Sequence, residues 1–434
     1  MAVAGPEPLH PVGRTLHLHR WVDGAVIAVA LAALGSGFGQ FGIVTALGDV
    51  AREFGRATHG ATIADQAGLS GTELGVGLAI IRLASLGSLP LIGLADRFGR
   101  RIMLIATLSL GLALTVASAA SPGYWSFVVI FACGRPFLSA TNALSQVAAA
   151  EQTASSDRTS AVALTAAGYG VGAGLIALIH SLASSSLGFR GIFALAVLPL
   201  AAVPFISRRI EESDRFRVSE VSPERPLPVV GAVGPRFRGR LLIVGVLAFA
   251  VSVITGPATS FVYLYAQNVL HQSGYITAAM VVGAGVSGLV GLLAGRWSAD
   301  HLGRRSTATV AMIALALFSA LTYEGSRAAL LSGYICAVMA GSMLAPAAGA
   351  LLTELFPTPV RASVAGWWVV AGVLGAGVGL LIFGTVADVG NKFALAAQLT
   401  FLPAALCVGL FWLLPETLGK EPEDLWPSPI DDGN

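Results

Sequence analysis

Two arginines stand inside long apolar stretches of the sequence, far from other charged residues. Arg82 and Arg135 each lie roughly ten residues from the start of such a stretch. If these stretches cross a membrane, a charge at that depth costs about 2.5–3.5 kcal/mol, and arginine does not lose its proton to escape the cost. The nearest acidic residues stand close to the ends of apolar stretches: Asp23, Asp49, Glu73 and Asp388. The two guanidinium groups therefore require water, helix carbonyls or a bound anion.

A guanidinium group donates two parallel hydrogen bonds to a carboxylate or phosphate, so these arginines favour a site that attracts an organic anion. The alternative is that each arginine bonds helix carbonyls and only supports the structure. No histidine lies in the middle of an apolar stretch, and His180 falls near the end of one. We therefore expect no obvious proton carrier among the side chains.

The composition indicates what surrounds these residues. Of the 434 residues, 55% are hydrophobic and 12% are charged, with a mean hydropathy of +0.76, whereas soluble proteins carry about 25% charged residues. The chain is therefore expected to be an integral membrane protein, and its net charge of +2 is too small for nucleic-acid binding. Neither lysine lies in a phosphate-binding loop, and the three cysteines lie in apolar runs. We expect no ATP hydrolysis, no cofactor and no metal.

Apolar runs long enough to cross a bilayer recur along the chain, and a crossing helix needs roughly 20 residues. They predict an all-α membrane protein, because irregular backbone at membrane depth would leave polar groups unsatisfied. Residues 1–23 lack the apolar core of a cleavable signal peptide. The twelve predicted transmembrane helices are 24–46, 73–95, 102–120, 124–146, 161–182, 190–206, 241–263, 274–296, 307–324, 328–351, 362–386 and 393–414.

The distribution of basic residues predicts the orientation, because arginine-rich and lysine-rich loops stay in the cytoplasm. With the N-terminus inside, 19 basic residues fall on the cytoplasmic side and 5 on the other. Both termini are therefore expected to be cytoplasmic. The predicted order is a tail (1–23), a six-helix bundle (24–206), a cytoplasmic linker (207–240), a second six-helix bundle (241–414) and a second tail (415–434).

The two bundles repeat each other in sequence. Asp96 and Arg100-Arg101 recur 204 residues later as Asp300 and Arg304-Arg305. Glu151 and Arg158 recur 203 residues later as Glu354 and Arg361, and residues 171–174 recur at the same shift as 374–377. Two six-span halves joined by a linker are typical of transporters that bind their solute at the midplane.

Four motifs resemble those of the major facilitator superfamily, in the family's order and on one predicted side of the membrane. Residues 93–101 (GLADRFGRR) are similar to the loop motif after span two, and 295–305 (GRWSADHLGRR) to its second-half copy. Residues 354–361 (ELFPTPVR) are similar to the motif before span eleven. Residues 415–423 (PETLGKEPE) resemble the tail of the sugar-porter-like and organic-acid branches. The glycine–proline pair of drug antiporters and the paired glutamines of sugar porters are missing from spans five and seven.

The resemblance implies two pseudo-symmetric bundles with a cavity lined by spans one, four and seven. Besides Arg82 and Arg135, it implies solute contacts for Gln40, Asn142, Gln146, Tyr263 and Tyr265. It also implies a cytoplasmic gate, in which Asp96 meets the N-terminus of span eleven and Asp300 that of span five, where a carboxylate is favoured. The remaining gate residues are Arg97, Arg100, Arg101, Glu151, Arg158, Arg304, Arg305, Glu354 and Arg361, and the predicted charge pairs among them are Glu151 with Arg158 and Glu354 with Arg361.

Together these features predict a secondary active or facilitative transporter, in the inner membrane of a bacterium, that moves a small organic anion by alternating access. A multidrug/proton efflux antiporter and a non-transporting membrane sensor are the alternatives. No cluster of catalytic side chains suggests an enzyme. The expected partners are the solute, the lipid bilayer and a coupling proton or counter-anion, and we expect a monomer that binds no nucleic acid.

Overall fold

The computed structural model describes residues 20–56, 63–154, 157–212, 234–389, 392–420 and Trp426. Most of the predicted N-terminal tail, linker and C-terminal tail lie outside these residues. Seven side chains within the described ranges are also outside the description: Ile63, Asp96, Ser184, Ser185, Thr358, Pro359 and Ala362.

The described chain is almost entirely helical. The first half contains α1 (Gly24–Thr45), α2 (Leu47–Phe54), α3 (Ile63–Ala67), α4 (Gly71–Ala84), η1 (Ser85–Gly87), α5 (Ser88–Phe98), α6 (Arg100–Ser118), α7 (Tyr124–Gln152), α8 (Arg158–Ala194) and α9 (Val197–Ser207). The second half contains η2 (Pro235–Phe237), α11 (Arg238–Ser260), α12 (Val262–Leu264), the π-helical η3 (Tyr265–Val269), α13 (Gly274–His301), α14 (Arg304–Leu321), α15 (Arg327–Glu354), α16 (Thr358–Asp388), α17 (Phe393–Ala405) and η4 (Leu406–Leu413). Gly188 interrupts α8 with a φ of 57°.

Within the described ranges, 12 helical segments are long and apolar enough to cross a membrane by length and composition. They coincide with the twelve predicted spans, and so confirm the all-helical prediction. The largest differences are in the fourth and seventh segments, Tyr124–Gln152 and Pro235–Val269, which extend six residues beyond the predicted ends. Hydropathy marks only the part of a helix inside the hydrocarbon core, and these helices continue beyond it.

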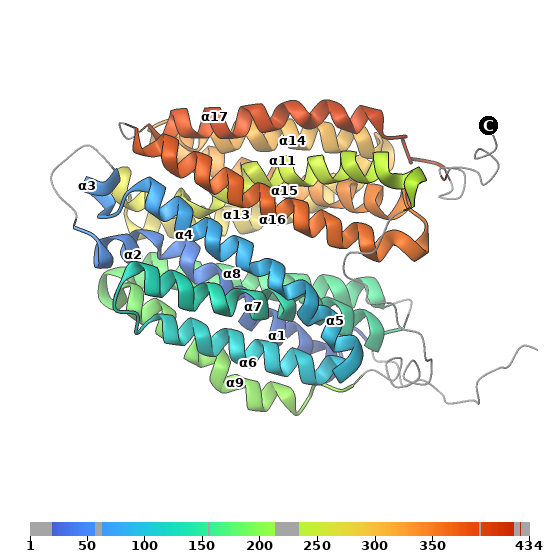
Figure 1. The fold of residues 1–434 in the computed structure, drawn as a ribbon, viewed down its shortest axis with the longest axis horizontal. Helices are drawn as coiled ribbons and strands as arrows, with labels where there is room; N and C mark the ends of the chain where they lie inside the picture. The colour runs from blue at the N-terminus through green and yellow to red at the C-terminus, as the bar shows by residue number, and fades with distance from the viewer. Residues whose placement is uncertain are drawn as a thin grey trace, which may run out of the picture.

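The helices run side by side along the long axis of the molecule, and the first half (blue to green) lies beneath the second (yellow to red) in Figure 1. α4 of the first half packs along α16 of the second, which makes this pair the main junction between the halves. We call the end with the Gly-Arg-Arg loops 99–101 and 303–305 the arginine end. The opposite end, where α16 finishes, is the Asp388 end.

Glycines of the sequence repeat have equivalent packing roles in the two halves. A side chain at Gly172 of α8 would collide with the Leu34 carbonyl of α1, and a side chain at Gly375 of α16 would collide with the Phe249 carbonyl of α11. Glycine is therefore needed at both positions for the helix backbones to touch, as in other membrane bundles. This correspondence supports the pseudo-symmetry of the two six-helix halves.

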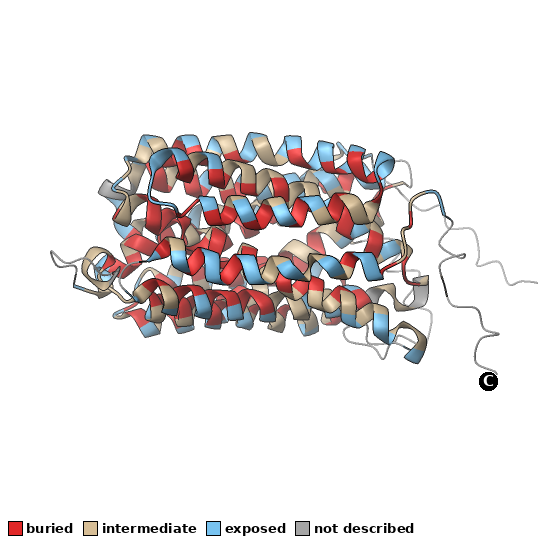
Figure 2. Ribbon diagram, turned by 90° about the horizontal axis from the view of Figure 1, so that it is seen from above, coloured by how far each residue is buried: buried red, intermediate tan, exposed pale blue. Residues whose placement is uncertain are grey.

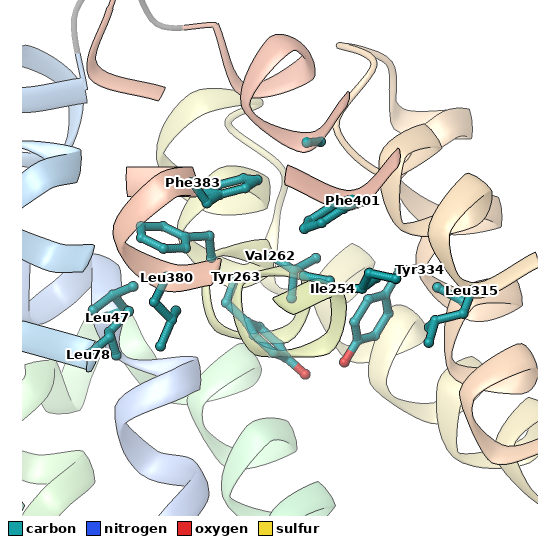
Figure 3. Packing of buried hydrophobic residues seen from close by; sticks show 14 of the residues in the cluster. Leu47, Leu78, Ile254, Val262, Tyr263, Leu315, Tyr334, Leu380, Phe383 and Phe401 are labelled. Atoms are coloured by element: carbon teal, nitrogen blue, oxygen red, sulfur yellow. The ribbon is translucent and has the colours of Figure 1, made fainter. Parts of the chain in front are cut away.

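Burial follows the pattern of a protein surrounded by lipid. Exposed positions alternate with buried ones along the helices (Figure 2), and many exposed side chains are large and apolar, including Phe205, Leu242 and Leu293. Inside the second half, aromatic and aliphatic side chains from α11, α15, α16 and α17 pack together (Figure 3). Phe383 and Phe401 stack there with ring centroids 5.7 Å apart.

Glycines also form the seam between α4 and α16 near the Asp388 end. A Cβ atom at Gly75 would lie 2.6 Å from the Leu380 carbonyl oxygen. A Cβ atom at Gly384 would collide with the Gly71 carbonyl. The two halves therefore approach each other through their backbones at this seam.

Candidate solute-binding site

A cavity of about 110 Å³ lies between the two halves. Its polar lining comes from α1, α4, α7, α8 and α11: Gln40, Arg82, Arg135, Tyr169, Thr259 and Ser260. Aliphatic and phenylalanine side chains complete the lining, and no aspartate or glutamate of the described chain takes part. The volume accommodates several water molecules or a small solute.

Arg135 is held against α1 on one side of this cavity. Its Nη1 donates a hydrogen bond to the Gln40 carbonyl oxygen at 3.2 Å. The Gln40 side chain is fixed in turn, because Nε2 donates to the Ser36 hydroxyl at 2.8 Å and this hydroxyl donates to the Leu138 carbonyl at 2.7 Å. Nε of Arg135 is buried without a hydrogen-bond partner in the described chain. A helix carbonyl thus satisfies only part of the guanidinium group.

Arg82 comes from the last turn of α4 and borders the same cavity. Within the described residues, its guanidinium group has no hydrogen-bond or ion-pair partner. It is close enough to Arg135 for the two positive charges to repel, and Tyr169 of α8 stands near both. Because no carboxylate lines the cavity, the two arginines leave it with a net positive charge. A bound anion would relieve both the repulsion and the missing hydrogen bonds.

The polar residues predicted further along α7 do not line the cavity. Asn142 and Gln146 lie on the part of α7 that leads to the arginine end. The Asn142 Oδ1 atom is buried without a hydrogen-bond partner in the described chain.

The two predicted tyrosines belong to the packing of the second half. Tyr263 is buried against Tyr334, with ring centroids 6.5 Å apart. The Tyr265 hydroxyl donates to the Tyr323 carbonyl at 3.0 Å and accepts from the Gly325 N–H at 2.9 Å. Neither lines the cavity, so the structure brings together only Gln40, Arg82 and Arg135 from the predicted set.

At the arginine end of the first half, Arg100 pairs with Glu151 through two contacts. Nε and Nη2 donate to the two carboxylate oxygens at 3.2 and 3.1 Å. The backbone N–H groups of Arg100 and Arg101, which begin α6, donate to the Glu212 carboxylate at 2.9 and 3.2 Å. Gly99 has a φ of 98°, and a Cβ atom there would lie 2.5 Å from Glu212 Oε2. The positive φ favours glycine at this position, and the absence of a side chain leaves room for the Glu212 carboxylate.

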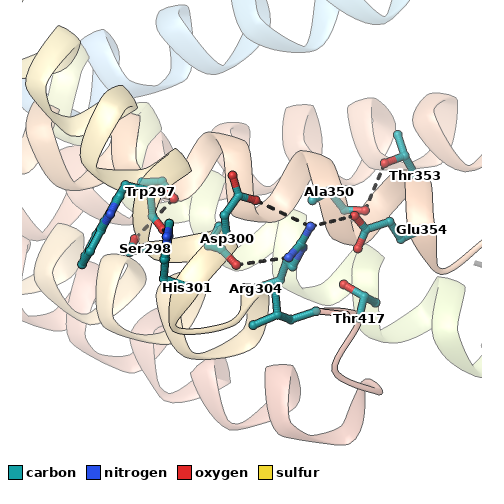
Figure 4. A network of polar contacts seen from close by, with 12 residues as sticks. Trp297, Ser298, Asp300, His301, Arg304, Ala350, Thr353, Glu354 and Thr417 are labelled. Atoms are coloured by element: carbon teal, nitrogen blue, oxygen red, sulfur yellow. Dashed lines mark hydrogen bonds and ion pairs between the residues drawn. The ribbon is translucent and has the colours of Figure 1, made fainter. Parts of the chain in front are cut away.

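The second half repeats this arrangement around Arg304 (Figure 4). Nη2 of Arg304 lies 3.2 Å from Glu354 Oε1 and 3.7 Å from Asp300 Oδ1. The backbone N–H groups of Arg304 and Arg305, which begin α14, donate to Glu416 at 3.0 and 3.2 Å. Gly303 precedes them with a φ of 100°, as Gly99 does in the first half.

The carboxylate of Glu416 is stabilised by this position. Burial raises the pKa of the Glu416 carboxyl, but hydrogen bonds from the backbone N–H groups of Arg304, Leu418, Arg305 and Thr417 outweigh burial, so the pKa lies below its ordinary value. Glu212 has the equivalent position, although the sequence motifs assigned it no role. The signal was present, because Glu212 and Glu416 are separated by the same 204 residues as Asp96 and Asp300.

These carboxylates bond residues of their own half. Asp300 lies beside Arg304, and its side chain is 52% exposed. The predicted partners of the two glutamates are wrong: Glu151 pairs with Arg100 and Glu354 with Arg304. Nε of Arg361 donates instead to the Phe356 carbonyl at 2.9 Å. Arg97 and Arg158 are exposed. The Asp96 side chain lies outside the described residues.

A carboxylate joins the two halves at the Asp388 end. Asp388, the last residue of α16, accepts hydrogen bonds from the N–H groups of Gly71 and Thr72 at 2.5 and 2.7 Å, and from the Thr72 hydroxyl at 2.5 Å. These groups begin α4, where the helix dipole favours a negative charge. The contact is the counterpart of the one predicted for Asp96, with the order of the two spans reversed. In the sequence, Asp388 is recognisable only as an acid near a span end.

Comparisons with known proteins agree with this architecture. The family model described as Major Facilitator Superfamily matches residues 29–323 and 286–430. A putative metabolite transport protein of Haemophilus influenzae is 24% identical over 344 residues, covering 75% of this chain and 83% of the relative. A probable 4-methylmuconolactone transporter of Cupriavidus pinatubonensis is 24% identical over 375 residues, covering 82% and 85%. The alpha-ketoglutarate permease of Escherichia coli is 27% identical over 203 residues, covering 43% and 44%.

Solved structures share the fold at low sequence identity. The inward-open xylose transporter of Escherichia coli superposes with a TM-score of 0.71 at 18% identity, covering 93% of this chain and 99% of that protein. The human organic anion transporter MFSD10 superposes with a TM-score of 0.61 at 16% identity, covering 90% and 97%. The family and the named relatives indicate a transporter of small solutes rather than an enzyme. The twelve helical segments, the repeated arginine loops and the family match together establish that this chain belongs to the Major Facilitator Superfamily.

Proposed function

We propose that this protein transports a small organic anion by alternating access, with Arg82 and Arg135 as the groups that bind it. One observation carries the proposal: the Arg82 guanidinium has no protein partner in the described chain and shares an acid-free cavity with a second arginine. The cavity lies between the two halves, where relative motion of the halves changes its access. A cationic drug would be repelled there, which disfavours the multidrug alternative.

Two relatives support this solute class. One is named as an alpha-ketoglutarate permease and the other as a probable 4-methylmuconolactone transporter. Alpha-ketoglutarate is a dicarboxylate, and two guanidinium groups can each bind one carboxylate or share one. The small cavity volume agrees with a solute of metabolite size.

A ligand screen on the purified protein tests the proposed function. Ligands that bind the folded state raise its apparent stability, by about 2.7 kcal/mol at a concentration of 100 times Kd. We expect dicarboxylates and monocarboxylates to raise the Tm, and neutral sugars and cationic drugs of similar size to leave it unchanged. Stabilisation by a cationic or neutral compound, with none by any anion, would show that the proposed solute class is wrong.

The proposal places the protein in a plasma membrane, with the arginine end in the cytoplasm. Cysteines introduced at Arg208 and Arg327, in a background without the natural cysteines, test this orientation. Both positions are exposed and lie at opposite ends of the molecule. In intact cells, a membrane-impermeant thiol reagent should label a cysteine at 327 and leave one at 208 unlabelled. The reverse pattern would invert the orientation, whereas opening the cells should make both positions reactive.

A further inference from the structure

A buried histidine–carboxylate pair lies at the Asp388 end of the first half. His180 of α8 is fully buried, and its Nε2 lies 2.7 Å from Oδ2 of Asp49 on α2. The other ring nitrogen, Nδ1, is buried and has no hydrogen-bond partner in the described chain. This pair belongs neither to the solute cavity nor to the contact between Asp388 and α4.

The second half covers this pair. Next to Asp49, Gly48 is packed so closely against Asn268 of η3 that a side chain at Gly48 would collide with the Asn268 amide. Next to His180, the Ser181 carbonyl is packed in the same way against Gly274, the first residue of α13. Separation of the halves at this end would therefore uncover both neighbours of the pair.

Four buried polar atoms without hydrogen-bond partners in the described chain lie at this part of the interface. Besides Nδ1 of His180, the Ser181 hydroxyl and both side-chain polar atoms of Asn268 are buried without hydrogen-bond partners in the described chain. Such groups are rare in proteins and indicate bound water or a ligand. A polar cavity of about 370 Å³ adjoins them, lined from the first half by Asp49, Arg52 and Ser181 and from the second by Gln267, Gln272 and Tyr275. Asp49 therefore connects the buried histidine with a cavity between the halves.

Few other charged groups lie near this pair on the described helices that pack against it. On α2, Nη1 of Arg52 lies 4.0 Å from Asp49 Oδ1, and the Arg52 side chain is 48% exposed. The remaining titratable and charged groups are Glu53, which is paired with Arg190 at 3.1 Å, Asp65 of α3, which has an interaction of its own, Tyr275 of α13, and His271 before it. Arg52 offsets only part of the Asp49 charge, because solvent screens an exposed side chain.

We propose that Asp49 and His180 form a proton-binding site whose occupancy is linked to closure of the Asp388 end. With a neutral imidazole, the pair carries one negative charge. With a proton on both ring nitrogens, it is neutral overall. Burial disfavours the net charge, so closure favours the protonated pair, whereas in the open interface the pair exchanges its proton with water.

The proton transfer involves no other chemistry. In the open state, a hydronium ion or buffer acid loses its proton, and a new N–H bond forms at Nδ1 of His180 while Nε2 keeps its hydrogen bond to Asp49. Closure then excludes water from the protonated pair. Proton binding and closure of the Asp388 end therefore favour each other, and this link does not depend on which solute is carried.

Distance measurements across the Asp388 end test the proposal without a solute. Spin labels on cysteines replacing Pro122 and Arg327, which are exposed on the first and second halves, report the separation of the halves in lipid nanodiscs. Histidine changes its charge between about pH 5 and pH 8. Over this range, the closed population of the otherwise unchanged protein should fall as the pH rises. A population that does not change with pH, or that follows sodium concentration in place of pH, would overturn the proposal.

Two substitutions give opposite expected shifts. His180→Gln keeps a donor near Asp49 but leaves the negative charge permanently unprotonated, so the open population should dominate at every pH. Asp49→Asn removes the negative charge, so the closed population should dominate where the imidazole is neutral and should no longer fall as the pH rises. The control His301→Gln replaces an exposed histidine at the arginine end and should keep the original pH response. A pH response that persists in both His180→Gln and Asp49→Asn would assign it to another group, such as Asp388, and would overturn the proposal.

Discussion

Replacement of Arg82 by alanine should strongly weaken binding of the anionic solute. The guanidinium group has no protein partner in the described chain, so all of its hydrogen-bond donors can bind a ligand. Removal of one partner from a buried, hydrogen-bonded charge pair costs about 2–5 kcal/mol. At about 1.4 kcal/mol per tenfold change in Kd, the affinity should fall by about 30-fold to several thousandfold. Binding by purified protein and uptake into proteoliposomes measure this loss.

Two further variants make this result specific. Arg82→Lys keeps the charge but loses the two parallel donors, so its affinity should lie between those of the original protein and Arg82→Ala. Arg296→Ala removes an exposed arginine of α13 outside the cavity and should bind normally. If Arg82→Ala binds an anion as tightly as the original protein, Arg82 is not the binding group. The twelve-span fold would stand in that case, since it rests on other residues.

Substitution of Asp388 by asparagine should shift the protein towards the state in which the Asp388 end is open. The carboxylate accepts three hydrogen bonds from the first turn of α4, and asparagine loses the charge and one strong acceptor. A charge at a helix terminus is worth up to about 2 kcal/mol when partly buried. The ratio of open to closed molecules should therefore rise, by up to about 30-fold. The Pro122 and Arg327 spin-label pair measures this ratio.

The control for this variant is a carboxylate at the same end that does not join the halves. Oε1 of Glu324 accepts a hydrogen bond from Gln398 at 2.9 Å, and both residues belong to the second half. Glu324→Gln should therefore leave the open and closed populations unchanged. Equal populations in Asp388→Asn and the original protein would show that the contact with α4 does not hold the end closed.

The spans and the repeat could be predicted from the sequence because each depends on local patterns. A run of apolar residues marks a crossing helix wherever it packs, and a repeated motif reveals an internal symmetry without any structure. Arg82 and Arg135 could be identified in the same way, since a charge in an apolar run is conspicuous by itself. Both arginines line one cavity, as a shared anion-binding site would require.

The partners of each charge could not be predicted, because they come from residues distant in the sequence. Asp49 and Asp388 were recognised only as acids near span ends, yet one bonds a histidine 131 residues away and the other caps a helix 317 residues away. His180 was set aside because it lies near a span end, yet its side chain is fully buried there. Asn142 and Tyr265 were placed by span number alone, which does not specify the rotation of a helix about its axis.

The glycine seam between α4 and α16 has a mechanical consequence. Side chains that interdigitate must change rotamer before two helices can slide, whereas the surfaces at Gly75 and Gly384 present mainly backbone. We expect such surfaces to interlock little, so that sliding along the seam meets a low barrier. The junction between the halves therefore combines a seam of backbone contacts with one set of hydrogen bonds, at the Asp388 end. We expect the glycines to permit relative motion of the halves, and the hydrogen bonds of Asp388 to stabilise the closed position.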